Sequence, residues 1–255
     1  MARTHPDPAN RTRGRRAKFG LVQAMILGAL ALGPPSAMAE IKSIWGPLQL
    51  PDGRSAFTDY KNLKVDDLQL TIDWADVAAN RPTAPRDPGD PAYAWPASVD
   101  QAISAADQAG IGISLMVLHT PGWANGGRTR VWAPTKAGAY ADFLAAAARR
   151  YPTVRRWMIW GEPNRHGQFQ PVPRMSPVGP RRYALLLDAA YGALKAANRR
   201  NIVIGGMTYT AGDVPPRWWL HWLRLPSGKP PRLDWWGHNP FTTRFPDLTK
   251  PVYVP

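Results

Sequence analysis

Short apolar runs alternate with helix-like stretches along most of this 255-residue chain, and this alternation constrains the fold more than any other feature. A strand that is followed by a helix, repeatedly, requires parallel strands, because each helix carries the chain back across the sheet. The expected strands are residues 43–50, 68–77, 111–118, 154–160, 201–207 and 233–238, and the expected helices are residues 97–110, 135–151, 180–200 and 215–224.

The six strand-helix units favour one kind of parallel sheet. No glycine-rich phosphate-binding turn follows the first expected strand, as it would in a dinucleotide-binding fold. The expected fold class is therefore α/β, a (β/α)8 TIM-barrel type with about six of the eight β/α units present. Reacting groups in such barrels gather at the carboxyl ends of the strands, so the residues that follow each strand are the first candidates for a site.

Residues 1–39 have the pattern of a secretory signal peptide. Six basic residues precede an apolar run over residues 19–33, and Ala37, Met38 and Ala39 form a small-residue cleavage site. A retained membrane anchor is the alternative. We expect a protein exported to the cell envelope or the medium, with no membrane contact after cleavage and one domain over residues 40–255.

Composition excludes several classes of function. The absence of cysteine rules out disulfide scaffolds, thiol nucleophiles and thiolate zinc sites. The formal net charge is +14, but the arginine pairs are scattered, so no nucleic-acid partner is expected. The spacing of His119, His166 and His238 is not typical of a metal site, and we expect neither metal nor cofactor.

Aromatic, amide and acidic residues follow four of the expected strands. Aromatic faces stack on sugar rings, while amides, imidazoles and carboxylates bind hydroxyl groups. The pattern is typical of a carbohydrate cleft. The segments are Asp73, Trp74 and Asp76 after the second strand, residues 119–125 after the third, residues 160–164 after the fourth and residues 238–241 after the sixth.

The segment Trp160-Gly-Glu-Pro-Asn164 resembles the Asn-Glu-Pro motif of clan-A glycoside hydrolases of families 5 and 39. The segment Thr120-Pro-Gly-Trp-Ala124 resembles their third strand end, His238 resembles their sixth-strand histidine, and the likeness covers about residues 43–255. The resemblance implies a retaining O-glycosidase acting on a glycoside, oligosaccharide or polysaccharide, with Glu162 as general acid/base. The implied substrate contacts are Trp74, His119, Trp123, Trp160, Asn164 and His238.

The chain departs from that pattern at two points. Gly161 replaces the asparagine that binds the sugar 2-hydroxyl in these families, and no glutamate follows Glu162. The nucleophile, a glutamate of the seventh strand in these families, is therefore expected to be missing, and this chain alone to be inactive. The chain is either a fragment of a longer enzyme or a natural short protein.

Other interpretations stay open. Glu162 could be a structural carboxylate paired with Arg165 or another arginine, and Trp74 could equally be a core residue. The whole chain could be a non-catalytic carbohydrate-binding or cell-envelope protein on the same scaffold, or a membrane-anchored protein with a structural domain.

Overall fold

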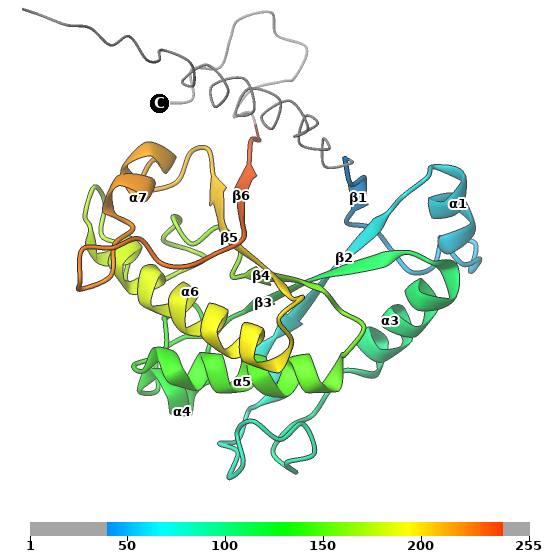
Figure 1. Ribbon diagram of the computed structural model, residues 1–255, viewed down its shortest axis with the longest axis horizontal. Helices are drawn as coiled ribbons and strands as arrows, with labels where there is room; N and C mark the ends of the chain where they lie inside the picture. Colours follow the sequence, from blue (N-terminus) through cyan, green and yellow to red (C-terminus); the bar gives the residue numbers. More distant parts are fainter. Residues whose placement is uncertain (1–39, 242–255) are drawn as a thin grey trace, which may run out of the picture. The chain divides into compact units, whose positions relative to one another are not determined.

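Six parallel strands form one sheet in the order β1-β2-β3-β4-β5-β6 (Figure 1). The computed structural model describes residues 40–241, so the expected signal peptide at residues 1–39 lies outside the described part. The strands are β1 (Ser43–Ile44), β2 (Asp67–Asp73), β3 (Gly112–Leu118), β4 (Arg156–Ile159), β5 (Ile202–Tyr209) and β6 (Trp235–Asn239). Each strand pairs with the next along the chain, which confirms the predicted partial (β/α)8 architecture and excludes the reversed order of a doubly wound sheet.

The helices follow the strands in alternation. Because every parallel crossover turns in the same right-handed sense and the strand order never reverses, the crossovers return on one face of the sheet. Figure 1 shows α5 and α6 side by side, and they pack directly on each other. The helices are α1 (Phe57–Asn62), α2 (Trp74–Val77), α3 (Ala97–Ala109), α4 (Gly122–Asn125), α5 (Ala137–Arg150), α6 (Val178–Ala197) and α7 (Pro216–Trp222).

The two faces of the sheet carry different side chains. The main core between sheet and helices holds Leu115, Trp157 and Val203, all fully buried. A second, smaller cluster contains Met158 and Ile204 with the partly buried Met116, Ile202 and Trp235. Side chains alternate across a strand, so the second cluster marks the opposite face, which would be the interior of a barrel.

An ion pair between the buried Asp67 and the partly buried Arg156 lies at the amino-terminal end of this inner face. Arg156 Nη1 of β4 lies 2.6 Å from Asp67 Oδ1 of β2, and the Ser43 hydroxyl of β1 donates to Asp67 Oδ2. The Asp67 side chain is only 1% exposed. Three strands are thus joined by polar contacts below the apolar cluster.

The expected first two strands are shorter in the structure. Residues 43–50 contribute only Ser43–Ile44, and residues 68–77 leave the sheet after Asp73. The Asp73 carboxylate accepts a hydrogen bond from the Ala75 amide, so it caps the short helix α2 and ends the strand.

The helix ends differ less from expectation. Gly110, the last residue of the expected helix 97–110, ends α3 in the left-handed conformation at φ 70°. The helix expected from residue 135 begins two residues later, at Ala137, and the Thr135 hydroxyl donates to the Ala124 carbonyl. The short helices α1, α2 and α4 were not expected. Over residues 40–241, no helix combines the length and the apolar character that a membrane span requires.

Candidate functional site

Glu162 follows β4 at the carboxyl end of the sheet, where the sequence predicted it. Its Oε2 accepts a bond from Arg165 Nη1 at 2.5 Å, and its Oε1 accepts one from Asn239 Nδ2 at 3.1 Å. Its main-chain amide donates to the Met207 carbonyl of β5. The carboxylate is therefore fixed between the ends of β4, β5 and β6, and its side chain is 16% exposed.

The backbone around Glu162 is strained. Four residues at the ends of β3 and β4 and within β5 have positive φ without being glycine: His119 at 66°, Trp160 at 66°, Glu162 at 47° and Met207 at 47°. Such conformations cost of order 1–3 kcal/mol each and are concentrated at functional sites in proteins. The strain marks this edge of the sheet as the candidate site.

A second polar cluster joins the ends of β2 and β3. His119 Nδ1 lies 2.6 Å from Asp73 Oδ2, and Arg130 Nη1 reaches the same oxygen at 2.5 Å. Arg130 also pairs with Asp76. Burial raises the pKa of Asp73, but the hydrogen bond and charge of His119 and the charge of Arg130 outweigh burial and hold that pKa below its ordinary value.

His238, the third expected polar contact, lies on β6 beside this edge. Its Nδ1 is 2.9 Å from the Thr208 hydroxyl of the neighbouring β5 residue in the register. The imidazole is partly buried. His119, Glu162 and His238 thus stand at the carboxyl ends of three strands of one sheet, as the sequence predicted.

Two of the tryptophans expected to contact a sugar lie in the core instead. Trp74 is 0% exposed and packs on Tyr140 and Phe143 of α5. Trp160 is equally buried in the helix-side core, and its indole donates to the Gln168 carbonyl. Neither indole is available to stack on a sugar in this structure, so Trp74 takes the core position that the sequence left open.

Two further expected substrate contacts, Trp123 and Asn164, use their polar groups in hydrogen bonds within the protein. Trp123 is half-buried against Trp74, and its indole donates to the Ala78 carbonyl. The amide of Asn164 is buried, donates to the carbonyls of Tyr209 and Val214, and accepts from the Tyr209 amide. Because its amide makes these bonds, Asn164 does not replace the sugar-binding asparagine of the families, whose position Gly161 occupies in this chain.

Gly161 faces the inner side of the sheet. A Cβ at this position would lie 3.1 Å from the Met116 sulfur and 3.9 Å from Leu118 Cδ2. Met116 belongs to the inner cluster, so position 161 points toward the barrel interior. A side chain at position 161 would therefore require the flexible Met116 side chain to move.

The pairing of Glu162 with Arg165, an alternative that the sequence left open, is present in the structure. Asn239 lies in the segment 238–241 that the sequence singled out, but its contact with Glu162 was not predicted, and Tyr209 was missed. The Arg165 guanidinium lies over the Tyr209 ring at 4.6 Å, and the Tyr209 ring is 6.5 Å from that of Phe241, which is 61% exposed. Over residues 40–241, no group of three or more histidine and acidic side chains is placed to hold a metal ion.

Comparison with known proteins gives a limited result. No protein-family model and no curated protein matches this chain. Similar solved structures include a family 39 glycoside hydrolase from Bacteroides cellulosilyticus WH2 with TM-score 0.47 and 19% identity, over 65% of this chain and 31% of that one. A glucosidase from Croceicoccus marinus has TM-score 0.48 and 15% identity, over 66% of this chain and 36% of the other.

A β-xylosidase from Caulobacter crescentus CB15 has TM-score 0.44 and 20% identity, over 65% of this chain and 34% of that protein. The matched part of this chain spans about a third of the length of these proteins. All three are glycoside hydrolases by their descriptions, and one belongs to a family that the sequence motif resembles. At such identities and TM-scores, the likeness carries no inference about activity.

Proposed function

We propose that the carboxyl ends of β3 to β6 form a carbohydrate site in which Glu162 donates a proton to a glycosidic oxygen. The observation that carries the proposal is the position of Glu162. It is the sole glutamate after residue 40, it stands at a strand end on strained backbone, and Arg165 and Asn239 fix both of its oxygens. The exposed Phe241 ring, 6.5 Å from the Tyr209 ring on which Arg165 lies, offers an apolar surface for a sugar ring.

The chemistry requires two events at the glycosidic bond. The bond between the anomeric carbon and the leaving oxygen breaks, the electron pair goes to that oxygen, and protonated Glu162 supplies its proton. A nucleophile must then bond to the anomeric carbon. Retaining enzymes use a carboxylate about 5–5.5 Å from the acid for this step, and no glutamate after Glu162 is present to supply it.

The ion pair of Glu162 adds a condition. An acid catalyst must carry a proton, whereas the contact with Arg165 is made by an ionised carboxylate. The Arg165 side chain is 42% exposed, and its guanidinium also lies on Tyr209. Proton donation by Glu162 therefore requires the substrate to displace Arg165 from the carboxylate.

Chemical rescue tests the proposal without the missing nucleophile. The full chain is incubated with azide and a panel of alkyl glycosides of xylose, glucose, mannose and arabinose. Azide bonds to the anomeric carbon, Glu162 protonates the departing alcohol, and the product is a glycosyl azide. We expect Glu162→Gln to lower this rate about 10²–10⁴-fold, because general acid catalysis contributes that much.

Two controls complete the experiment. Glu40→Gln removes the other glutamate, which is exposed, and should leave the rate unchanged. In 2,4-dinitrophenyl glycosides the leaving group departs as a phenolate and needs no proton. Glu162→Gln should therefore leave their reaction rate unchanged. Equal rates for Glu162→Gln and the unmodified chain on alkyl glycosides, or no glycosyl azide from any sugar, would reject Glu162 as the proton donor.

A non-catalytic carbohydrate-binding function is the second candidate. The Arg165 ion pair favours it, because an ionised, paired Glu162 serves binding of hydroxyl groups as well as structure. In that case tryptophan fluorescence would change on titration with an oligosaccharide, while no glycosyl azide forms.

A further inference from the structure

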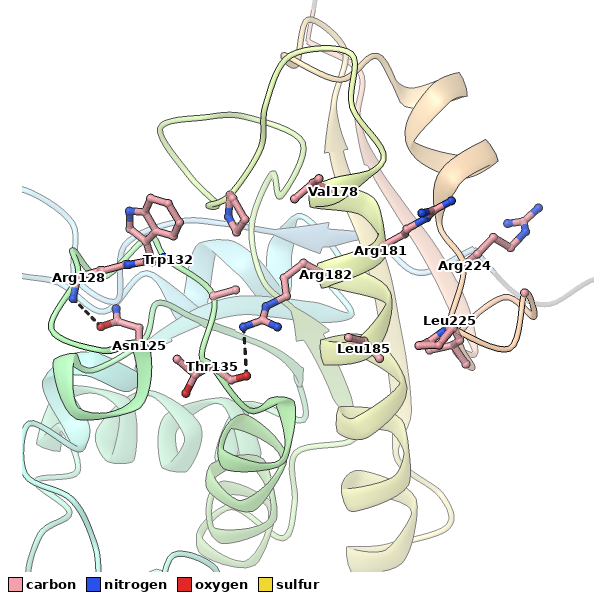
Figure 2. A pocket seen from close by; sticks show the side chains of 14 residues that line it. Asn125, Arg128, Trp132, Thr135, Val178, Arg181, Arg182, Leu185, Arg224 and Leu225 are labelled. Atoms are coloured by element: carbon pink, nitrogen blue, oxygen red, sulfur yellow. Dashed lines mark hydrogen bonds between the residues drawn. The ribbon is translucent and has the colours of Figure 1, made fainter.

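A cavity of about 730 Å³ lies beside the first two turns of α6. Its walls come from α6, from the segment between α4 and α5, and from the loop after α7 (Figure 2). None of its lining residues belongs to the Glu162 or Asp73 clusters. The volume falls in the range of small-molecule sites, about 300–1,000 Å³.

The charge of the lining is one-sided. Four of the lining residues are arginines, Arg128, Arg181, Arg182 and Arg224, and no lining residue is acidic. Outside the cavity, seven described arginines pair with a carboxylate, and seven others in residues 40–241 do not. Within residues 40–241, none of the four cavity arginines has such a pair. What distinguishes the cavity is that four unpaired arginines line one hollow.

Backbone carbonyls hold two of these guanidinium groups in place. Arg182 donates to the carbonyls of Pro134 and Thr135, and Figure 2 shows it reaching across the cavity from α6. Arg224 donates to the carbonyls of Leu220 and Leu223. Each contact uses one nitrogen of a group with five N–H donors, so charge and donors remain for a ligand.

Arg128 and Trp132 add a planar surface at the other end of the cavity. The Arg128 guanidinium lies 4.3 Å from the centre of the Trp132 ring. Leu185, Val178 and Leu225 supply apolar lining between this stack and Arg224. The cavity therefore joins cationic donors to an aromatic and aliphatic wall.

We propose that this cavity binds an organic anion, a phosphate or sulfate ester with an apolar or aromatic body. Planar guanidinium groups bind oxyanions through paired N–H donors, and a phosphate or sulfate ester offers three terminal oxygens to several arginines at once, where a carboxylate offers two. Figure 2 shows Arg181 and Arg224 extending to the same side of α6.

Calorimetric titration of the full chain tests the proposal. The probes are 4-nitrophenyl phosphate and 4-nitrophenyl sulfate, whose comparison separates the two esters, with 4-nitrobenzoate and 4-nitrophenyl β-glucoside as carboxylate and neutral comparisons. We expect one of the two esters to bind at least about tenfold more tightly than both comparisons, and to weaken as salt rises from about 50 to about 500 mM.

Matched variants locate the site. The double variant Arg181→Gln/Arg224→Gln should weaken ester binding at least about tenfold. The control Arg199→Gln/Arg200→Gln removes the same number of charges from two exposed arginines outside the cavity and should change ester binding less than twofold. Binding of the glucoside as tightly as the esters, equal losses in the control and the cavity variant, or no ester binding at low salt would each overturn the proposal.

Discussion

The buried pair of Arg156 and Asp67 gives a prediction whose size follows from the structure. Replacing Arg156 by methionine keeps a long apolar side chain but removes the cation 2.6 Å from Asp67. Asp67, 1% exposed, would then keep only the Ser43 hydroxyl as a side-chain partner. Removing one partner of a buried pair costs about 3–5 kcal/mol, because the remaining charge is neither solvated nor compensated.

Urea unfolding followed by tryptophan fluorescence measures this cost. With a slope of about 2 kcal/mol per molar urea, a loss of about 3–5 kcal/mol lowers the midpoint by about 1.5–2.5 M. The double variant Arg156→Met/Asp67→Leu should recover most of the loss, because a buried pair replaced by apolar groups is often neutral. The unpartnered Nε of Arg156 shows that the native pair is not fully satisfied, which favours this recovery.

The comparison of single and double variants shows whether the loss of stability comes from an uncompensated charge on Asp67. A single variant that loses less than about 1 kcal/mol would show that water reaches Asp67. A double variant as unstable as the single one would show that the loss comes from packing at position 156 rather than from an isolated charge.

Two further variants test the carboxyl edge and the core. Asp73 has a lowered pKa in the folded chain, so its stabilisation is present above its ordinary value of 3.8 and is lost as pH falls through the lowered value. Asp73→Asn should cost about 1–3 kcal/mol at neutral pH and progressively less in acid, and a cost independent of pH down to about pH 2 would contradict this. Trp74→Ala should cost about 3–5 kcal/mol, since Trp74 is fully buried. The matched change Trp45→Ala, at a residue 77% exposed, should stay within about 0.5 kcal/mol in thermal unfolding, and similar losses for both would refute the core assignment of Trp74.

The strand pattern was predictable because burial on the helix side repeats every second residue. Leu115 and Val117 in β3 and Trp157 and Ile159 in β4 are such buried positions, and their apolar runs marked both strands in the sequence. The length of the first strand was overestimated, since only Ser43–Ile44 of the expected residues 43–50 pair with β2. An apolar run alone does not show whether a neighbouring strand is there to receive its hydrogen bonds.

The site was predictable in position but not in orientation. Ile159 and Trp160 are consecutive, yet both side chains are buried in the core beneath the helices. A regular strand would place them on opposite faces, and the positive φ of Trp160 breaks that alternation. The residue types at positions 159–162 do not predict this turn, so the sequence analysis expected the Trp160 indole on the side of the sheet that would face a ligand.

The same backbone turn connects Trp160, whose position the sequence did not predict, with Glu162, the proposed proton donor. Trp160 at φ 66° and Glu162 at φ 47° flank Gly161, whose missing side chain would point to the inner Met116. Glycine or asparagine would adopt positive φ at lower cost, yet tryptophan and glutamate occupy these two positions. The Trp160 indole fills the core and donates to Gln168, while Glu162 reaches Asn239 on β6. The core contacts of Trp160 thus hold the strained turn, and the turn places the carboxylate at the strand ends, where we propose that a sugar binds.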